Sequence, residues 1–431
     1  MSKEKNRKNF SKYVSQNILG MIGFSCYVLA DSYFISIAKG ADGLTALNLV
    51  MPLYSIIFSI GEMIGVGSAI RYAIGKIKKD ADADDYFWNA IIWCIMSSMI
   101  FVFAGIFFSA DIMRVLGADE HIVAVGNNYT KIFMCFAPMF MCNYVTNAFV
   151  RNDGAPGIAM SATLFSSLFN IVFDYILMFP MNLGMEGAAL ATALSPIIGM
   201  GICSIHFFSK KSSVRLVVCK PSVRKLVAGS QLGVSAFVGE MSSAVITLVF
   251  NFVILKLAGN VGVAAYGVVA NIAIVTTAVF NGVAQGSQPL ISSCFGRGDK
   301  DGCTQLKRMG YTTTFVLAAV MYSILFIFAE QLVAVFNSEG SEMLRLYATE
   351  GVKLYFIGIF FAGINIVGGG AFSATEDAFK AAVVSVARGF VLILGAVFVM
   401  SALFGMTGVW LAYAVAEGIT TFIMLVMVLR V

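Results

Sequence analysis

Long apolar segments, separated by short polar ones, recur along the whole chain. Each segment has at least about 20 residues, the length that an α-helix needs to cross about 30 Å of hydrocarbon. Uninterrupted apolar runs of this length favour membrane spans over the amphipathic helices of a soluble core. The pattern predicts spans at residues 14–37, 45–70, 87–109, 122–149, 158–180, 187–208, 226–255, 262–290, 311–336, 346–373, 380–404 and 407–430.

The composition supports a membrane protein. Of the 431 residues, 59% are hydrophobic and only 12% are charged. A soluble domain could not cover its surface with so few polar side chains, whereas a lipid bilayer can surround an apolar one. The net charge of +5 does not by itself indicate a nucleic-acid partner, so we predict none.

Several kinds of chemistry are absent from the sequence. The eight cysteines are scattered without a CxxC pair, and no phosphate-binding loop GxxxxGK[ST] or HExxH motif occurs. These absences disfavour an ATP-driven pump and a metalloprotease, so we predict neither an enzyme nor a cofactor. The first apolar segment runs to Ile37 without a small-residue cleavage site, so we interpret it as a retained helix.

Basic residues lie mostly on one side of the predicted spans. If the N-terminus is cytoplasmic, most of the 29 Lys and Arg residues lie in cytoplasmic segments, and Arg388 and Arg430 are counted among them. The exceptions are Lys39, Arg114, Lys131, Lys256, Arg345 and Lys353. This bias predicts that both termini face the cytoplasm.

The two halves of the chain resemble each other. The longest basic connection, 209–225, divides the spans six and six, which predicts an N-lobe (1–208) and a C-lobe (226–431). Three pairs of segments match at nearly constant offset: Gly184-Met185-Glu186-Gly187 with Gly405-Met406-Thr407-Gly408, Ala148-Phe149 with Ala371-Phe372, and Gly67-Ser68 with Gly286-Ser287. Six spans preserve membrane orientation, so the repeat is parallel. We predict an all-α polytopic membrane protein with twelve spans in two pseudo-symmetric six-helix bundles around a central cavity.

Polar residues within the spans of the first half indicate a functional site. They are Tyr27, Asp31, Asn147, Asn170, Asp174 and Thr192. Asn170 and Asp174 are four residues apart and share a helix face, and the repeat places Val391 and Gly395 at their positions in the second half.

A carboxylate inside a membrane is costly and usually functional. Carboxylate, amide and hydroxyl oxygens bind a hard cation such as Na⁺. Alternatively, burial and mutual repulsion keep a proton on one carboxyl group. A third possibility is that Asp31 lies at the membrane surface and is simply solvated.

Three further acids lie within predicted spans: Glu62, Glu240 and Glu417. Each could line the cavity and attract a cationic substrate. Each could also be paired locally and stabilise helix packing, so both interpretations stay open.

Together these features resemble the multidrug and toxic compound extrusion (MATE) transporters, in particular their bacterial DinF-like branch. The resemblance covers nearly the whole chain. It rests on Leu29-Ala30-Asp31-Ser32-Tyr33-Phe34-Ile35, Pro52 with Gly65-Val66-Gly67, Phe149-Val150-Arg151-Asn152-Asp153-Gly154, Asn170 to Asp174, and the run from Gly184 to Thr192.

The resemblance implies a secondary exporter of amphipathic, often cationic compounds, driven by Na⁺ or H⁺ antiport through alternating access. It implies coupling residues Asp31, Tyr27, Asn147, Asn170, Asp174 and Thr192, with Asp31, Asn170, Asp174 and Thr192 as ligands if the ion is Na⁺. An acid in the seventh span, as in some members of the family, would be Glu240. The implied setting is a monomer in the bacterial inner membrane.

One feature departs from the family pattern. Residues 13–18 hold no proline, although members often carry one early in the first helix, where it bends. Gly20 and Gly23 could still soften this helix.

Other functions were weighed against this one. A lipid-linked oligosaccharide flippase would need a strongly cationic cavity, whereas the predicted membrane interior holds mainly acids. Export of a single endogenous metabolite stays open. A non-transporting receptor or scaffold would not need polar groups in only one half of the repeat.

Overall fold

The computed structural model describes residues 3–337 and 340–429, and within these residues all regular secondary structure is helical. This confirms the predicted all-α fold. Arg430, the predicted end of the last span, lies outside the described residues.

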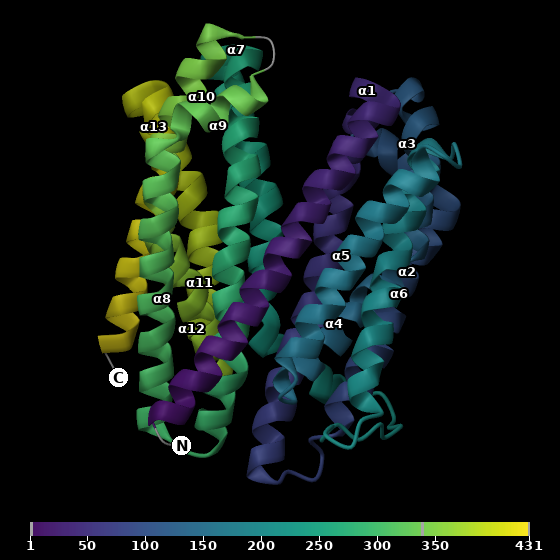
Figure 1. The fold of residues 1–431 in the computed structure, drawn as a ribbon, viewed down its shortest axis with the longest axis vertical. Helices are drawn as coiled ribbons and strands as arrows, with labels where there is room; N and C mark the ends of the chain where they lie inside the picture. The colour runs from purple at the N-terminus through teal and green to yellow at the C-terminus, as the bar shows by residue number, and fades with distance from the viewer. Residues whose placement is uncertain (1–2, 338–339, 430–431) are drawn as a thin grey trace. The chain divides into compact units, whose positions relative to one another are not determined.

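The first half of the chain contains α1 to α6 (Figure 1), which make six spans because α1 is broken once and one bent pair of helices counts as a single span. Helix α1 (Lys3–Lys78) consists of two helices joined at Gly40. The helices α3 and α4 are bent by 46° at a one-residue break and together make one span. The remaining elements of this half are α2 (Asp85–Val115), α3 (Glu120–Cys135), α4 (Ala137–Asn152), α5 (Pro156–Met178) and α6 (Gly184–Phe207).

The second half has the same plan. Helix α7 (Val223–Gly296) is broken at Gly259, and helix α13 (Leu392–Leu429) is broken at Gly405. Between them lie α8 (Lys300–Ile327), α9 (Ala329–Phe336), α10 (Glu342–Tyr355), a 3₁₀ turn (Phe356–Gly358), α11 (Ile359–Ala374), α12 (Ala378–Val386) and a π-helical turn (Ala387–Val391).

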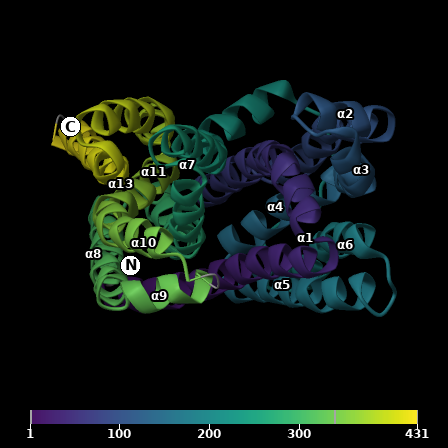
Figure 2. The same ribbon diagram turned by 90° about the horizontal axis from the view of Figure 1, so that it is seen from above.

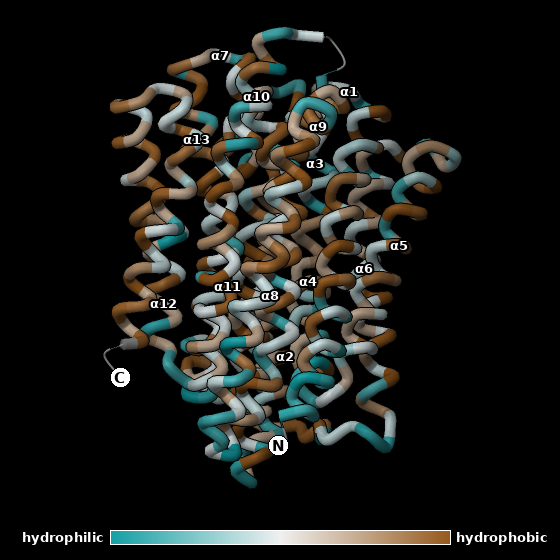
Figure 3. The backbone as a smooth tube through the Cα atoms, turned by 60° about the vertical axis from the view of Figure 1, so that its left-hand side comes forward, coloured by the Kyte–Doolittle hydropathy of each residue, from teal (hydrophilic) through white to brown (hydrophobic). Residues whose placement is uncertain are grey.

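The helices have the length and apolarity of membrane spans. The described residues contain nine helices that meet this standard, or ten when the bent pair is included. Two of these helices, Val223–Gly296 and Ala378–Val428, are each divided into two spans by a glycine break. The number of spans among the described residues is therefore twelve, as predicted. Apolar residues colour the middles of the helices and polar residues gather at their ends (Figure 3), as expected for a bilayer-spanning protein.

The backbone repeats between the halves. Gly40 has φ 59° and Gly259, 219 residues later, has φ 63°. Gly184 has φ 52° and Gly405, 221 residues later, has φ 59°. A left-handed conformation costs a side-chain-bearing residue more than it costs glycine. The same breaks at the same places support a shared fold for the two halves.

A hydrogen bond also recurs, with donor and acceptor exchanged. The Asn128 Nδ2 donates to Glu186 Oε1 at 2.6 Å in the first half. In the second half, the Thr407 hydroxyl donates to Glu350 Oε1, also at 2.6 Å. Each bond joins the fourth span of its half to the start of the sixth, so the parallel repeat extends to side-chain contacts.

The chain folds into two compact units. The N-unit comprises Ser15–Phe237 and Ser292–Asp299, and the C-unit comprises the residues up to Val14, Val238–Ile291 and the residues from Lys300 onward. Thus α1 begins in the C-unit and α7 begins in the N-unit, each before continuing into the other. The lobe and linker limits expected from the basic connection stay a prediction. In Figure 2, α5 and α6 lie side by side within the N-unit.

One carboxylate, Asp153, holds the first part of the connection between α6 and α7 against the rest of the N-unit. Asp153 Oδ1 accepts a hydrogen bond from the Tyr72 hydroxyl at 2.8 Å. Its Oδ2 lies 2.8 Å from His206 Nε2 and accepts from the backbone N–H of Ser213 at 2.8 Å and from the Ser212 hydroxyl at 3.3 Å. Because the Asp153 and His206 side chains are buried, these bonds form away from competing water.

Replacing Asp153 with Ala is expected to release this connection. Loss of several hydrogen bonds to a charged group, each worth about 1.5–3 kcal/mol, should speed tryptic cleavage at the exposed Lys210 and Lys211 about tenfold or more. Limited proteolysis of the purified protein measures this. The control Asp301→Ala removes an exposed acid from α8 and should leave cleavage unchanged. Equal cleavage rates for the two variants would contradict the prediction.

Candidate functional site

Two carboxylates lie buried within the N-unit. Asp31 on α1 is 6% exposed and Asp174 on α5 is fully buried. The two carboxyl groups lie within electrostatic range of each other. In each, Oδ1 is buried without a hydrogen-bond partner. Asp31 is therefore enclosed by protein, which argues against the alternative of a solvated residue at the membrane surface.

Asn170 and Thr192 complete the cluster. Asn170 lies one turn before Asp174 on α5, and both Asn170 and Thr192 are buried. A carboxylate can only accept, so the amide orientation that satisfies both neighbours directs nitrogen to Asp174 Oδ2, at 3.1 Å. The amide oxygen then accepts from the Thr192 hydroxyl on α6, also at 3.1 Å. The i, i+4 spacing read from the sequence thus predicts a real contact.

Two tyrosines that sequence reasoning missed lie beside the carboxylates. The hydroxyls of Tyr54 on α1 and Tyr129 on α3 form a buried hydrogen bond with each other. Both tyrosines lie within electrostatic range of Asp31 and Asp174. Aromatic residues are common in membrane spans, so neither position stands out in the sequence. The only available signal is that a buried hydroxyl needs a polar partner.

The other two predicted coupling residues differ in placement. Tyr27 is half-buried, packs edge-on against Phe24 with ring centroids 5.1 Å apart, and lies within electrostatic range of Tyr54. Asn147 instead donates to the Ala159 carbonyl and the Thr163 hydroxyl, each at 3.2 Å. Thr163 lies two helical turns before Asn170, so these contacts place Asn147 about 10 Å along α5 from the cluster.

The three predicted cavity acids have different surroundings. Glu62 is half-buried in the N-unit and lies within electrostatic range of the buried Arg151. Glu240 is half-buried on α7 in the C-unit. Glu417 is 2% exposed and forms an ion pair with Arg388, which corresponds to the local-pairing interpretation. Arg388 itself lies inside a span, so counting it among cytoplasmic loop charges was wrong.

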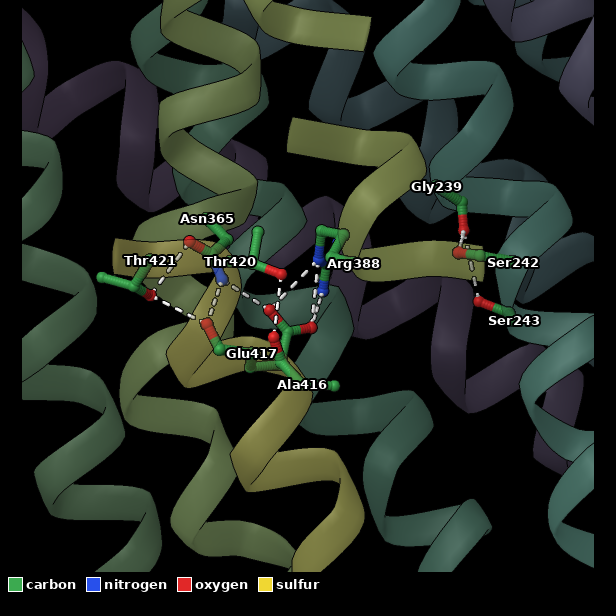
Figure 4. A network of polar contacts seen from close by, with 9 residues as sticks. All are labelled: Gly239, Ser242, Ser243, Asn365, Arg388, Ala416, Glu417, Thr420 and Thr421. Atoms are coloured by element: carbon green, nitrogen blue, oxygen red, sulfur yellow. Dashed lines mark hydrogen bonds and ion pairs between the residues drawn. The ribbon is translucent and has the colours of Figure 1, made fainter. Parts of the chain in front are cut away.

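The C-unit contains a different polar network around Glu417 (Figure 4). Arg388 donates to Glu417 Oε1 through Nη2 at 2.6 Å and through Nε at 3.0 Å. Asn365 Nδ2 donates to Glu417 Oε2 at 2.7 Å, and the Thr421 hydroxyl donates to Asn365 Oδ1 at 3.0 Å. Both carboxylate oxygens of Glu417 therefore accept hydrogen bonds. In Asp31 and Asp174, by contrast, Oδ1 has no hydrogen-bond partner.

Two of the C-unit positions that correspond to the carboxylate cluster are aromatic. Phe250 follows Asp31 by 219 residues and Tyr413 follows Thr192 by 221. Phe250 stacks on Tyr266 with ring centroids 5.1 Å apart, and Tyr413 stacks on Tyr355 at 4.4 Å. The repeat therefore preserves the helices, but packed rings lie at the positions of Asp31 and Thr192, and Val391 and Gly395 lie at those of Asn170 and Asp174.

The donor set of the cluster suits a hard cation better than a transition metal. Among the described residues, no three His, Cys, Asp or Glu side chains gather in a way that could hold a metal ion. Two carboxylates with an amide and a hydroxyl supply only oxygen ligands and polar donors. A separate pocket of about 300 Å³ in the C-unit includes none of the predicted site residues; its lining is Glu330, Arg345, Leu346, Thr349, Glu350 and Lys353.

Comparison with known proteins gives consistent results. The chain is 27% identical over 410 residues to the multidrug export protein MepA of Staphylococcus saprophyticus, covering 93% of this chain and 89% of that protein. It is 28% identical over 415 residues to MepA of Staphylococcus aureus, with the same coverage.

Solved structures share the fold. One, described as the outward-facing conformation of a multidrug resistance MATE family transporter of the MOP superfamily, has a TM-score of 0.92 and 20% identity, covering 99% of this chain and 96% of that one. Another, a MOP superfamily transporter from Pyrococcus furiosus whose binding pocket is described as having reverse polarity, has a TM-score of 0.90 and 19% identity, covering 98% and 95%.

The model of the MatE family matches residues 17–176 and 236–399, which include both halves of the repeat. The match covers more than half of the chain, and its two segments fall within the first and the second set of six spans. The chain therefore belongs to the MatE family of membrane transporters, as its sequence pattern predicts, and is not an enzyme.

Proposed function

We propose that this protein is a secondary active multidrug exporter that exchanges Na⁺ or H⁺ for amphipathic, often cationic compounds. The observation that carries the proposal is the pair of buried carboxylates, Asp31 and Asp174, each with one oxygen that accepts no hydrogen bond. Two enclosed carboxylates near each other repel, and a bound cation or proton relieves that repulsion.

Coupling then follows from differential binding. A cation between Asp31 and Asp174 stabilises the packing of α1 against α5, whereas the empty site favours their separation. A ligand shifts a conformational equilibrium only as far as its affinities for the two states differ. Asn170 and Thr192 hold the Asp174 carboxylate in position, and the paired hydroxyls of Tyr54 and Tyr129 offer further oxygens nearby.

The substrate class is proposed from the relatives and from the acids of the spans. The relatives in Staphylococcus carry the name multidrug export protein. Glu240 and Glu62 are half-buried acids that would attract a cationic compound. We place the protein in the bacterial inner membrane as a monomer, with both termini in the cytoplasm because of its basic cytoplasmic segments.

Inverted membrane vesicles test transport and coupling together. An imposed Na⁺ gradient or an imposed pH gradient should drive accumulation of ethidium, and the effective gradient identifies the coupling ion. Vesicles from cells without the protein are the control. If neither the Na⁺ gradient nor the pH gradient drives ethidium accumulation, coupled export is overturned. Transport of one endogenous metabolite, with no response to several unrelated cationic dyes, would replace multidrug export with a dedicated exporter.

A further inference from the structure

A buried ion pair lies inside the spans of the C-unit, at Arg388 and Glu417. Glu417 is almost fully buried, and the Arg388 guanidinium binds it through Nε and Nη2. Asn365 Nδ2 donates a hydrogen bond to the other carboxylate oxygen, Oε2. Burying such a pair costs desolvation energy that a pair of apolar residues would avoid, so its presence within the membrane calls for a physical role.

The backbone is built to place this arginine. Arg388 lies in the π-helical turn Ala387–Val391, which changes the direction in which its side chain points relative to an ordinary helix. The next residue, Gly389, faces Ser242 of α7, where an added Cβ would lie 2.6 Å from the Ser242 Cβ. This close approach fixes the turn against α7 within the C-unit, so the guanidinium has a defined position.

The ion pair lies close to the counterpart of the acidic cluster. Tyr413 is the repeat counterpart of Thr192, and Glu417 lies one helical turn after Tyr413. The corresponding cluster of the N-unit carries two buried carboxylates, Asp31 and Asp174. The C-unit carries one carboxylate together with its own cation.

We propose that Arg388 is a built-in counter-ion, whose guanidinium permanently occupies a cation position at Glu417 and so prevents free cations from binding in the C-unit. This inference rests on the proposed function in assigning cation exchange to the N-unit. Arginine stays charged at any physiological pH and binds a carboxylate through two parallel donors. The Arg388–Glu417 pair consequently keeps one charge state throughout transport, whereas the acidic cluster of the N-unit responds to the coupling ion.

The proposal predicts that removing the guanidinium creates a cation site. In Arg388→Ala, the Glu417 carboxylate and the Tyr413 hydroxyl border the space that the guanidinium leaves. The melting temperature of the purified protein should fall, and low millimolar guanidinium or added Na⁺ should restore at least half of the loss. Choline at equal ionic strength controls for salt. Wild type and Arg388→Lys, which retain a built-in cation, should show no such response.

A double variant keeps the proposal testable if Arg388→Ala does not fold. Arg388→Ala with Glu417→Gln removes both charges, so it should fold and melt independently of Na⁺ and guanidinium. A merely structural role for Arg388 predicts no cation rescue in the single variant, and that result overturns the proposal. Cation rescue that persists in the double variant also overturns it. These measurements need no transport, so they stand apart from the vesicle test of export.

Discussion

Replacing Asp31 or Asp174 with Asn is expected to abolish cation-driven export while leaving the protein folded. Asparagine has nearly the volume of aspartate but carries no charge and does not titrate at physiological pH. Each substitution therefore removes the electrostatic response to Na⁺ or H⁺ without opening a cavity. Ethidium efflux from whole cells should fall to the background of cells without the protein, for either variant.

Two measurements separate lost coupling from lost folding. The amount of protein in the membrane and the melting temperature of purified protein should stay near those of wild type in both variants. The matched control is Asp111→Asn, because Asp111 is exposed and pairs with Arg114 at 2.7 Å at the end of α2. Exposed ion pairs contribute only about 0–1 kcal/mol, so this variant should export normally. Full efflux by both buried-site variants would contradict the proposed coupling role.

Much of the candidate site could be predicted from helical spacing and the repeat. Asn170 and Asp174 share a face in any α-helix, and their absence from the second half distinguishes them from packing residues. Tyr54 and Tyr129 could not be found in this way, because their importance depends on which spans are neighbours. Arg388 was misplaced because a count of loop charges cannot distinguish a loop arginine from one that pairs inside a span.

The apolar pattern predicts the number of membrane spans correctly but does not predict where the helices begin. Helix α1 begins at Lys3 and α8 begins at Lys300, each 11 residues before the span predicted there (14–37 and 311–336). The hydropathy pattern reports the part of a helix that faces lipid, whereas hydrogen bonding continues the helix into polar surroundings. The two polar starts support each other within the C-unit, since Asn6 Nδ2 donates to Gln305 Oε1 at 3.3 Å.

The repeat also shows which features each half can change. The glycine breaks at Gly40 and Gly259 are retained, since the backbone path depends on them. The buried charges differ, since a carboxylate cluster and an arginine–carboxylate pair satisfy their electrostatics in different ways. If the proposed coupling holds, the acidic cluster responds to a cation while the Arg388–Glu417 pair keeps a fixed charge.

The backbones of α7 and of the second part of α1 are in close contact, so a side chain added at this contact is expected to destabilise the protein strongly. Both segments lie in the N-unit, where Gly233 of α7 faces the backbone of Met63. A Cβ at Gly233 would lie 1.9 Å from the Met63 carbonyl oxygen, and one at Gly67 would lie 2.0 Å from the Gly229 carbonyl oxygen. Backbone atoms cannot move aside as a side chain can, so the two helices would have to separate.

Gly233→Ala is therefore expected to lower the free energy of unfolding by about 3 kcal/mol, the upper range for overpacking, and to reduce export. The matched control is Gly239→Ala, six residues further along α7, where an added Cβ meets no atom within 4 Å. Alanine is favoured over glycine in a helix by about 0.8–1 kcal/mol, so the control should melt at or above the wild-type temperature. Thermal melting of purified protein in detergent distinguishes them. Equal melting temperatures would show that this contact does not hold α7 against α1.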